Sequence, residues 1–283
     1  MSGTPVFSFA RRWASRAPAR TPLSLGAPFL AALLAVAPAR ANDDIPPQFM
    51  TQYEAARDYL HLIQAAEAAN APTQLDSADA MQLLAAITHR DAILAPDYVP
   101  ADLGLLVNAC EYGKTVSTQL MQFGLAAMPA AVRIHPGEQA SLHRRNAERF
   151  QPQLGLLLPY LLRCGARIQP LLDQWLTVAT PDERAALGPD GTDTLRRNAQ
   201  RQYLDMLETM RAQPADSALR HTLVRALAET AAPYARMLQP AQRLPVRDAL
   251  KDARKQMDEN DAALLQQAVV AFSADGCGTL CAS

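Results

Sequence analysis

Apolar side chains recur at steps of three and four residues along most of this chain, and this spacing is the strongest constraint on its fold. In one early segment the series runs through Phe49, Tyr53, Ala56, Leu60 and Ile63. Because an α-helix has 3.6 residues per turn, this spacing gathers the apolar side chains along one side of a helix, which can then be buried. No segment alternates between polar and apolar residues for long enough to indicate a β-strand. The sequence therefore predicts an all-α fold.

The interruptions of this spacing predict where helices begin. Proline costs no hydrogen bond in the first turn of a helix, and a Ser or Thr hydroxyl can accept one from a free N–H group there. Helix starts are expected at Pro46, Ser77, Thr180 and Pro214. Together these patterns predict a multi-helical bundle of about eight helices in a single helical domain, residues 42–283. The expected helices span residues 46–70, 77–90, 101–128, 137–166, 168–179, 192–213, 215–238 and 241–273.

Three further prolines fall inside the expected helices, namely Pro152, Pro159 and Pro233. A proline in a helix interior removes one N–H donor and its ring clashes with the preceding turn. We therefore expect each of these prolines to break or kink its helix.

The first 41 residues have the pattern of a secretory signal peptide. They contain five arginines and no acidic residue, an apolar block between Leu23 and Ala37, and then the small residues Ala39 and Ala41 at Ala-x-Ala spacing. We expect cleavage after Ala41. The apolar block is interrupted by Pro28 and is shorter than the roughly 20 residues that span a bilayer, so no transmembrane anchor is expected after cleavage. The sequence thus predicts a periplasmic or secreted protein.

The charge balance argues against a nucleic-acid partner. Residues 42–283 carry 22 basic and 28 acidic side chains, so the net charge of the expected mature chain is -6. Binding to phosphate groups requires a basic surface. We therefore expect the partner to be a protein or a small molecule of unknown identity.

Four cysteines remain in the expected mature chain, an even number that in an oxidising compartment indicates two disulfides. Cys110 and Cys164 each lie in the apolar series of an expected helix. Two antiparallel helices would bring these series together, so we pair Cys110 with Cys164 and, by elimination, Cys277 with Cys281. Free buried thiols are the alternative for the helix cysteines. For Cys277 and Cys281 the alternatives are a redox pair or a copper-binding pair, because two thiols close in sequence can exchange disulfides or bind a soft cation.

One polar group is out of place in the helical pattern. Lys114 lies among the apolar positions of its helix, where an amine needs a partner or must reach water. An ion pair with Glu111 would satisfy it. His143 and Asn146 extend the apolar series of the helix after it and could face Lys114 or Glu111. These four residues form the candidate pocket of the sequence.

No sequence signature of a hydrolase, a zinc protease, a phosphate-binding loop or a c-type haem is present. Glu54, Asp58 and His61 share the polar side of the first helix, so no metal site and no cofactor are expected. The favoured interpretation is an exported, non-enzymatic helical binding or interaction protein. The alternatives are an exported enzyme or small-molecule-binding protein with a pocket around Lys114, Glu111 and His143, and a metal or redox carrier that acts through Cys277 and Cys281.

Overall fold

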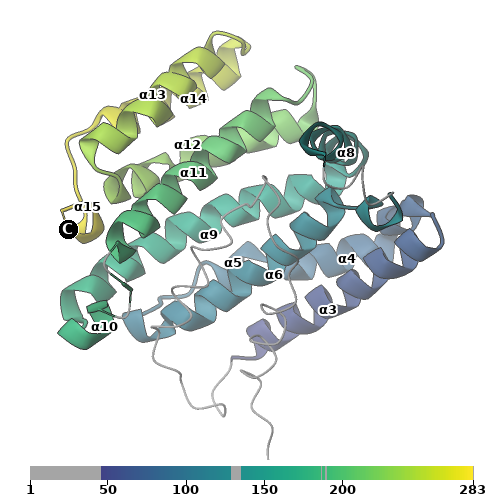
Figure 1. Cartoon of the computed structure of the whole chain (residues 1–283), viewed down its shortest axis with the longest axis horizontal. Coiled ribbons are helices and arrows are strands. Elements are labelled where there is room, and N and C mark those ends of the chain that lie inside the picture. Colours follow the sequence, from purple (N-terminus) through teal and green to yellow (C-terminus); the bar gives the residue numbers. More distant parts are fainter. Residues whose placement is uncertain (1–45, 129–134, 186, 189, 283) are drawn as a thin grey trace, which may run out of the picture.

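The computed structural model describes residues 46–128, 135–185, 187–188 and 190–282, and these contain helices and no strand (Figure 1). The all-α prediction is therefore confirmed. The longer helices are α3 (Pro47–Ala68), α4 (Ala78–Ile87), α6 (Leu103–Met121), α8 (Pro136–Arg149), α9 (Gln151–Val178), α11 (Gly191–Arg211), α12 (Ala218–Met237), α13 (Pro240–Arg254) and α14 (Glu259–Ser273). Short α-helices are α5 (Arg90–Ile93), α10 (Pro181–Ala185) and α15 (Thr279–Ala282), and short 3₁₀ helices are η2 (Pro72–Asp76), η3 (Pro100–Asp102) and η4 (Leu125–Ala127).

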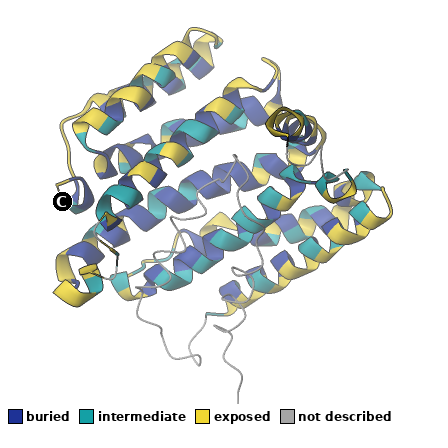
Figure 2. Cartoon of the chain, in the orientation of Figure 1, coloured by how far each residue is buried: buried dark blue, intermediate teal, exposed yellow. Residues whose placement is uncertain are grey.

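The helices lie in layers that follow the order of the chain. Figure 1 shows α3 and α4 on one side, then α6 and α9, then α11 and α12, and finally α13 and α14 on the opposite side. Figure 2 shows that α9 is buried along most of its length, whereas the outermost helices keep one exposed side. The core is therefore built around α9, the longest helix of the described chain.

Several predicted helix starts are confirmed, and their caps explain them. The Ser77 hydroxyl accepts a hydrogen bond from the N–H of Ala80, and Pro47 occupies the first turn of α3. The Thr180 hydroxyl accepts one from the N–H of Glu183 at the start of α10. The start predicted at Pro214 is wrong, because α12 begins only at Ala218.

Other predicted helix boundaries also differ from the structure. The expected helix 101–128 ends at Met121, because Gly124 adopts a left-handed conformation and a separate 3₁₀ helix follows it. The expected helix 137–166 is interrupted at Phe150, and α9 then continues through residue 167 to Val178 with Pro159 and Pro170 inside it. Pro152 lies in the first turn of α9, where its missing N–H has no intrahelical acceptor to lose. The expected helix 241–273 is two helices, because Asp258 caps a new one by accepting a hydrogen bond from the N–H of Asp261.

The central pair of helices is α6 and α9, which run antiparallel. Their contacts run in opposite directions along the two helices: Cys110 is bonded to Cys164, and one turn later in α6 Gly113 lies against the ring of Tyr160, which is one turn earlier in α9. Cys110 and Cys164 form a disulfide with their Cα atoms 5.9 Å apart. Both residues are buried, with exposed fractions of 1% and 2%. The structure therefore confirms the predicted pairing of Cys110 with Cys164 and the burial of both residues.

Two buried glutamines fasten the N-terminal helices to one another and to α9. The side-chain amide of Gln52 on α3 donates to the carbonyls of Ile87 and Ala109, at 2.7 and 3.0 Å. The amide of Gln153 on α9 donates to the carbonyl of Leu75 at 2.9 Å. The bonds to Ile87 and Leu75 satisfy carbonyls at the end of α4 and in η2, where a buried unpaired polar group would be costly, and the bond to Ala109 joins α3 to the middle of α6.

The predicted signal peptide, with Ala39 and Ala41, lies outside the described residues. Among the helices that the structure describes, none combines the length and apolar character needed to cross a membrane. The polar residues Glu54, Asp58 and His61 are all exposed on α3, as their spacing predicts.

Candidate functional site

Lys114 and Glu111, the first two members of the predicted pocket, form an ion pair one turn apart on α6. The Nζ atom of Lys114 donates to Oε1 of Glu111 at 2.9 Å. The side chain of Lys114 is 13% exposed and that of Glu111 is 28% exposed. The amine therefore has the partner that the sequence suggested for it.

Asn146 lies elsewhere and has a structural role. Its amide nitrogen donates to the carbonyls of Met121 and Phe123, both at 2.9 Å, where α6 ends. Met121 is seven residues beyond Lys114, which at about 1.5 Å per residue is about 10 Å along the helix axis. The prediction that Asn146 faces Lys114 or Glu111 is thus wrong, because the free carbonyls at a helix end are its partners.

His143 is the unusual member of this set. It lies one turn before Asn146 on α8 and is only 6% exposed. Neither of its ring nitrogens has a hydrogen-bond partner among the described residues. Burial lowers the pKa of the His143 imidazole, because the charged form loses its hydration. The ring is therefore held neutral in the protein interior.

This burial predicts a pH dependence of stability. In the unfolded chain His143 binds a proton near its ordinary pKa of about 6.5, whereas the folded protein resists protonation until a lower pH. The free energy of unfolding should therefore fall as the pH drops below about 6.5. We expect His143→Leu to weaken this fall and His61→Leu, at an exposed position of α3, to leave it unchanged. Urea titrations across the acidic range measure both slopes, and equal slopes in His143→Leu and the unaltered protein would contradict the prediction.

A groove of about 470 Å³ lies on the other half of the molecule, between the C-terminal part of α11 and the outer helix α13. Its lining residues are Leu204, Leu207, Glu208, Arg211, Ala212, Ala249 and Gln256. The leucines and alanines provide an apolar floor, while the exposed Glu208 and Arg211 provide one negative and one positive charge at its border. In the described part of the chain, no hydrogen bond or ion pair engages either of these two charged groups.

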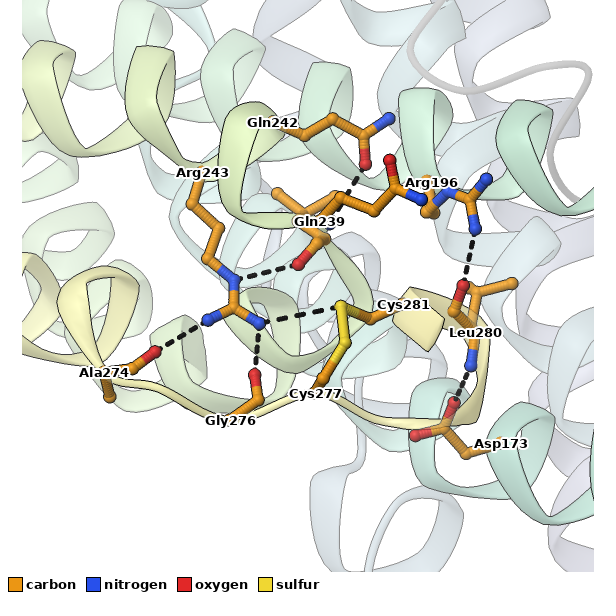
Figure 3. Close-up of a disulfide and its surroundings, with 11 residues drawn as sticks. Asp173, Arg196, Gln239, Gln242, Arg243, Ala274, Gly276, Cys277, Leu280 and Cys281 are labelled. Carbon is orange, nitrogen blue, oxygen red and sulfur yellow. Dashed lines mark hydrogen bonds between the residues drawn. A yellow bond between two sulfur atoms is a disulfide. The ribbon is translucent and has the colours of Figure 1, made fainter. Parts of the chain in front are cut away.

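The two C-terminal cysteines form the second disulfide, within a segment that we call the cysteine segment, residues 274–282 (Figure 3). Arg243 of α13 binds the main chain of this segment, and its side chain is buried, with an exposed fraction of 6%. The Arg243 guanidinium donates to the carbonyls of Leu238, Ala274 and Gly276. Its Nη2 atom also lies 3.8 Å from Sγ of Cys281.

The segment has a second set of anchors at Leu280. Asp173 accepts a hydrogen bond from the N–H of Leu280 at 2.9 Å, and Arg196 donates to its carbonyl at 2.7 Å. The N–H of Gly278 donates to the carbonyl of Arg236. Asp173 approaches so closely that a Cβ atom on residue 278 would lie 2.0 Å from its Oδ2 atom, so a larger residue there would displace the carboxylate that binds Leu280. Three side chains, from α9, α11 and α13, and one main-chain carbonyl, from α12, thus hold the segment in place.

Comparisons with protein-family models, with curated proteins and with solved structures find no match to this chain. Its function must therefore be inferred from its own geometry. Among the described residues, the groove and the cysteine segment are accessible to an outside molecule.

One further cluster contains groups that could hold a metal ion. His221, Asp258 and Asp261 bring one ligand atom each within 4.8 Å of one another. Two contacts inside the cluster already explain it: Nδ1 of His221 lies 2.7 Å from Oδ2 of Asp261, and Asp258 caps α14. The positive end of the α14 dipole also disfavours a cation at this position.

The sequence indicated Lys114, Glu111 and the cysteines, but it missed the groove and Arg243. Arg243 could have been found, because it occupies the buried series of α13 that continues through Val246, Leu250 and Ala253. An arginine in such a series needs acceptors, and carbonyls from a neighbouring segment supply them. The groove has no comparable signal, because it depends on the separation of two helices.

Proposed function

We propose that this chain is an exported, non-enzymatic binding protein whose ligand lies in the groove between α11 and α13. The ligand has an apolar body and carries both a positive and a negative group, as a short peptide does. The observation that carries the proposal is the apolar floor bordered by Glu208 and Arg211, whose side chains form no direct hydrogen bond or ion pair within the described chain. The volume is within the range of about 300–1,000 Å³ that small-molecule sites occupy.

Two other features support this proposal. The two disulfides agree with a protein made for an oxidising compartment. The amine of Lys114, the most plausible nucleophile in the sequence, is held in an ion pair with Glu111, which favours a binding role over catalysis.

The test uses trileucine, which has an apolar body and two charged ends, as the probe. We expect calorimetry to detect binding to the unaltered protein, and Ala249→Trp, which fills the groove, to weaken it about tenfold or more, a loss of at least about 1.4 kcal/mol. Ala241→Trp is the matched control, because Ala241 is an exposed residue of the same helix that does not line the groove.

The charged border is tested separately. Trileucine with an acetylated N-terminus and an amidated C-terminus has the same apolar body without charges, and it should bind more weakly than trileucine. Equal affinity of the two peptides would contradict the role of Glu208 and Arg211. Absence of trileucine binding, or equal binding to Ala249→Trp and Ala241→Trp, would overturn the proposed site.

A further inference from the structure

The two sulfur atoms of the Cys277–Cys281 disulfide lie in unequal surroundings. Cys277 is exposed, whereas Cys281 is only 3% exposed. The other disulfide has no accessible end, since both Cys110 and Cys164 are buried. An external thiol can therefore reach the second bridge at Cys277, while the first bridge is shielded.

The buried sulfur has a cation beside it. Nη2 of Arg243 lies 3.8 Å from Sγ of Cys281, and arginine stays protonated at every pH at which proteins fold (Figure 3). Of the other charged groups nearby, Asp173 and Arg196 bind the main chain of Leu280, whereas Asp275 interacts electrostatically with the guanidinium of Arg243. A thiolate at Cys281 would thus be stabilised by the neighbouring guanidinium, and a stabilised thiolate is a good leaving group in disulfide exchange.

We propose that Cys277–Cys281 is a thiol–disulfide exchange site for an external dithiol, which attacks Cys277 and displaces Cys281. A thiolate of the dithiol forms a bond to Sγ of Cys277, the bond between the two cysteines breaks, and its electron pair leaves on Sγ of Cys281 next to Arg243. The second thiolate of the reagent then attacks its own sulfur in the mixed disulfide. Cys277 leaves and takes a proton from water, so the dithiol becomes oxidised and the protein pair becomes reduced.

The anchors at the segment explain how the reduced pair can close again when an external disulfide reverses the exchange and accepts the two electrons. The bonds of Leu280 to Asp173 and Arg196, and of Gly278 to the carbonyl of Arg236, do not involve the disulfide. They keep Cys281 beside Arg243 when the bridge is open, so that Cys277 remains within reach. This inference is independent of the groove and of its ligand.

The first experiment compares the two bridges in the same folded molecule. The full chain is treated with dithiothreitol at neutral pH, quenched by alkylation at successive times, and analysed by peptide mass spectrometry. We expect Cys277–Cys281 to open at least about tenfold faster than Cys110–Cys164. Equal rates of opening for the two disulfides would overturn the proposal. Opening of Cys277–Cys281 only in denaturant would also overturn it.

The second experiment identifies the attacked sulfur. Brief treatment with the monothiol glutathione, followed by acid quenching, traps the mixed disulfide, and fragmentation of the peptide locates it. The adduct is expected on Cys277. An adduct on Cys281 would overturn the direction of exchange.

The third experiment tests the role of Arg243 as a positioning residue. In a Cys277→Ser background, the ultraviolet absorbance of the thiolate gives the pKa of Cys281, which we expect below the ordinary value of about 8.5. Adding Arg243→Gln should raise this pKa, and Arg243→Lys should keep it low. Arg196→Gln is the matched control, because it removes another arginine bond to the segment without removing the cation beside the sulfur. A pKa that moves equally with Arg196→Gln and Arg243→Gln would show that both substitutions merely loosen the segment, and the proposed role of the guanidinium would fail.

Discussion

Replacing Cys110 and Cys164 together by alanine should lower the free energy of unfolding by about 4 kcal/mol. The bridge closes a loop over a sequence separation of 54 residues, and the chain-entropy relation gives this value for a loop of that length. The effect arises mainly in the unfolded chain, which loses a restraint. Urea unfolding of the double variant measures it, with tryptophan fluorescence as the signal.

The second disulfide provides the control for this prediction. Cys277 and Cys281 are separated by only four residues, and the same relation gives about 2 kcal/mol for replacing them by alanine. The loss in Cys110→Ala/Cys164→Ala should therefore be roughly twice as large. A larger loss of unfolding free energy from replacing Cys277 and Cys281 than from replacing Cys110 and Cys164 would contradict the loop-length argument.

The secondary structure could be predicted because its signal is local. Phe49, Ala56 and Ile63 lie at helical spacing, and all three are buried on one side of α3. The antiparallel packing of α6 on α9 followed from the same spacing, because each helix presents one cysteine in its apolar series. The helix assignments required only residues within a few turns of one another, whereas the pairing of Cys110 with Cys164 required two such series to be compared.

The helix boundaries were less predictable, because they depend on tertiary packing. A proline inside a helix removes a hydrogen bond, yet α9 continues through Pro159 and Pro170. Its neighbours explain this: Leu171 and Leu172 are buried directly after Pro170, so burial on several sides outweighs the lost bond. The opposite occurs near Asp258, where the side-chain cap stabilises a new start and divides the expected last helix.

The candidate site was predicted only in its local parts. Lys114 and Glu111 are three residues apart on one helix, so their pairing could be read from the sequence. Asn146 could not be placed, because its acceptors belong to the end of another helix, 23 and 25 residues away in the chain. The contact of Arg243 with Cys281 spans 38 residues and joins α13 to a segment without long helices. Contacts of this kind follow from the packed fold and leave no periodic pattern.

Gly165→Ala should strongly destabilise this protein, although it adds only one methyl group. Gly165 lies on α9 where α12 packs against it, and a Cβ atom there would lie 1.9 Å from the hydroxyl of Tyr234 and 2.7 Å from the ring carbon that bears it. Tyr234 is fully buried, and its ring centroid is 5.2 Å from that of Tyr203, so the ring cannot move aside. We expect a loss of about 3 kcal/mol in the free energy of unfolding, the upper part of the usual range for overpacking.

Gly155→Ala is the matched control on the same helix. A Cβ atom at residue 155 meets nothing within 4 Å, so the substitution should stabilise the protein by about 0.5–1 kcal/mol through helix propensity alone. A stabilising effect of alanine at both glycines would contradict the close packing of α12 on α9.

A double-mutant cycle with Tyr234→Phe tests whether contact with the Tyr234 hydroxyl causes the loss of stability in Gly165→Ala. The Tyr234 hydroxyl has no hydrogen-bond partner among the described residues, so its removal alone should change stability little. In the Gly165→Ala background the same change removes the nearest atom to the new methyl group and should restore part of the lost stability. The restoration should be incomplete, since the ring carbon at 2.7 Å stays in place. Additive effects of the two substitutions would show that the methyl group and the hydroxyl do not meet, and that the loss at Gly165 has another origin.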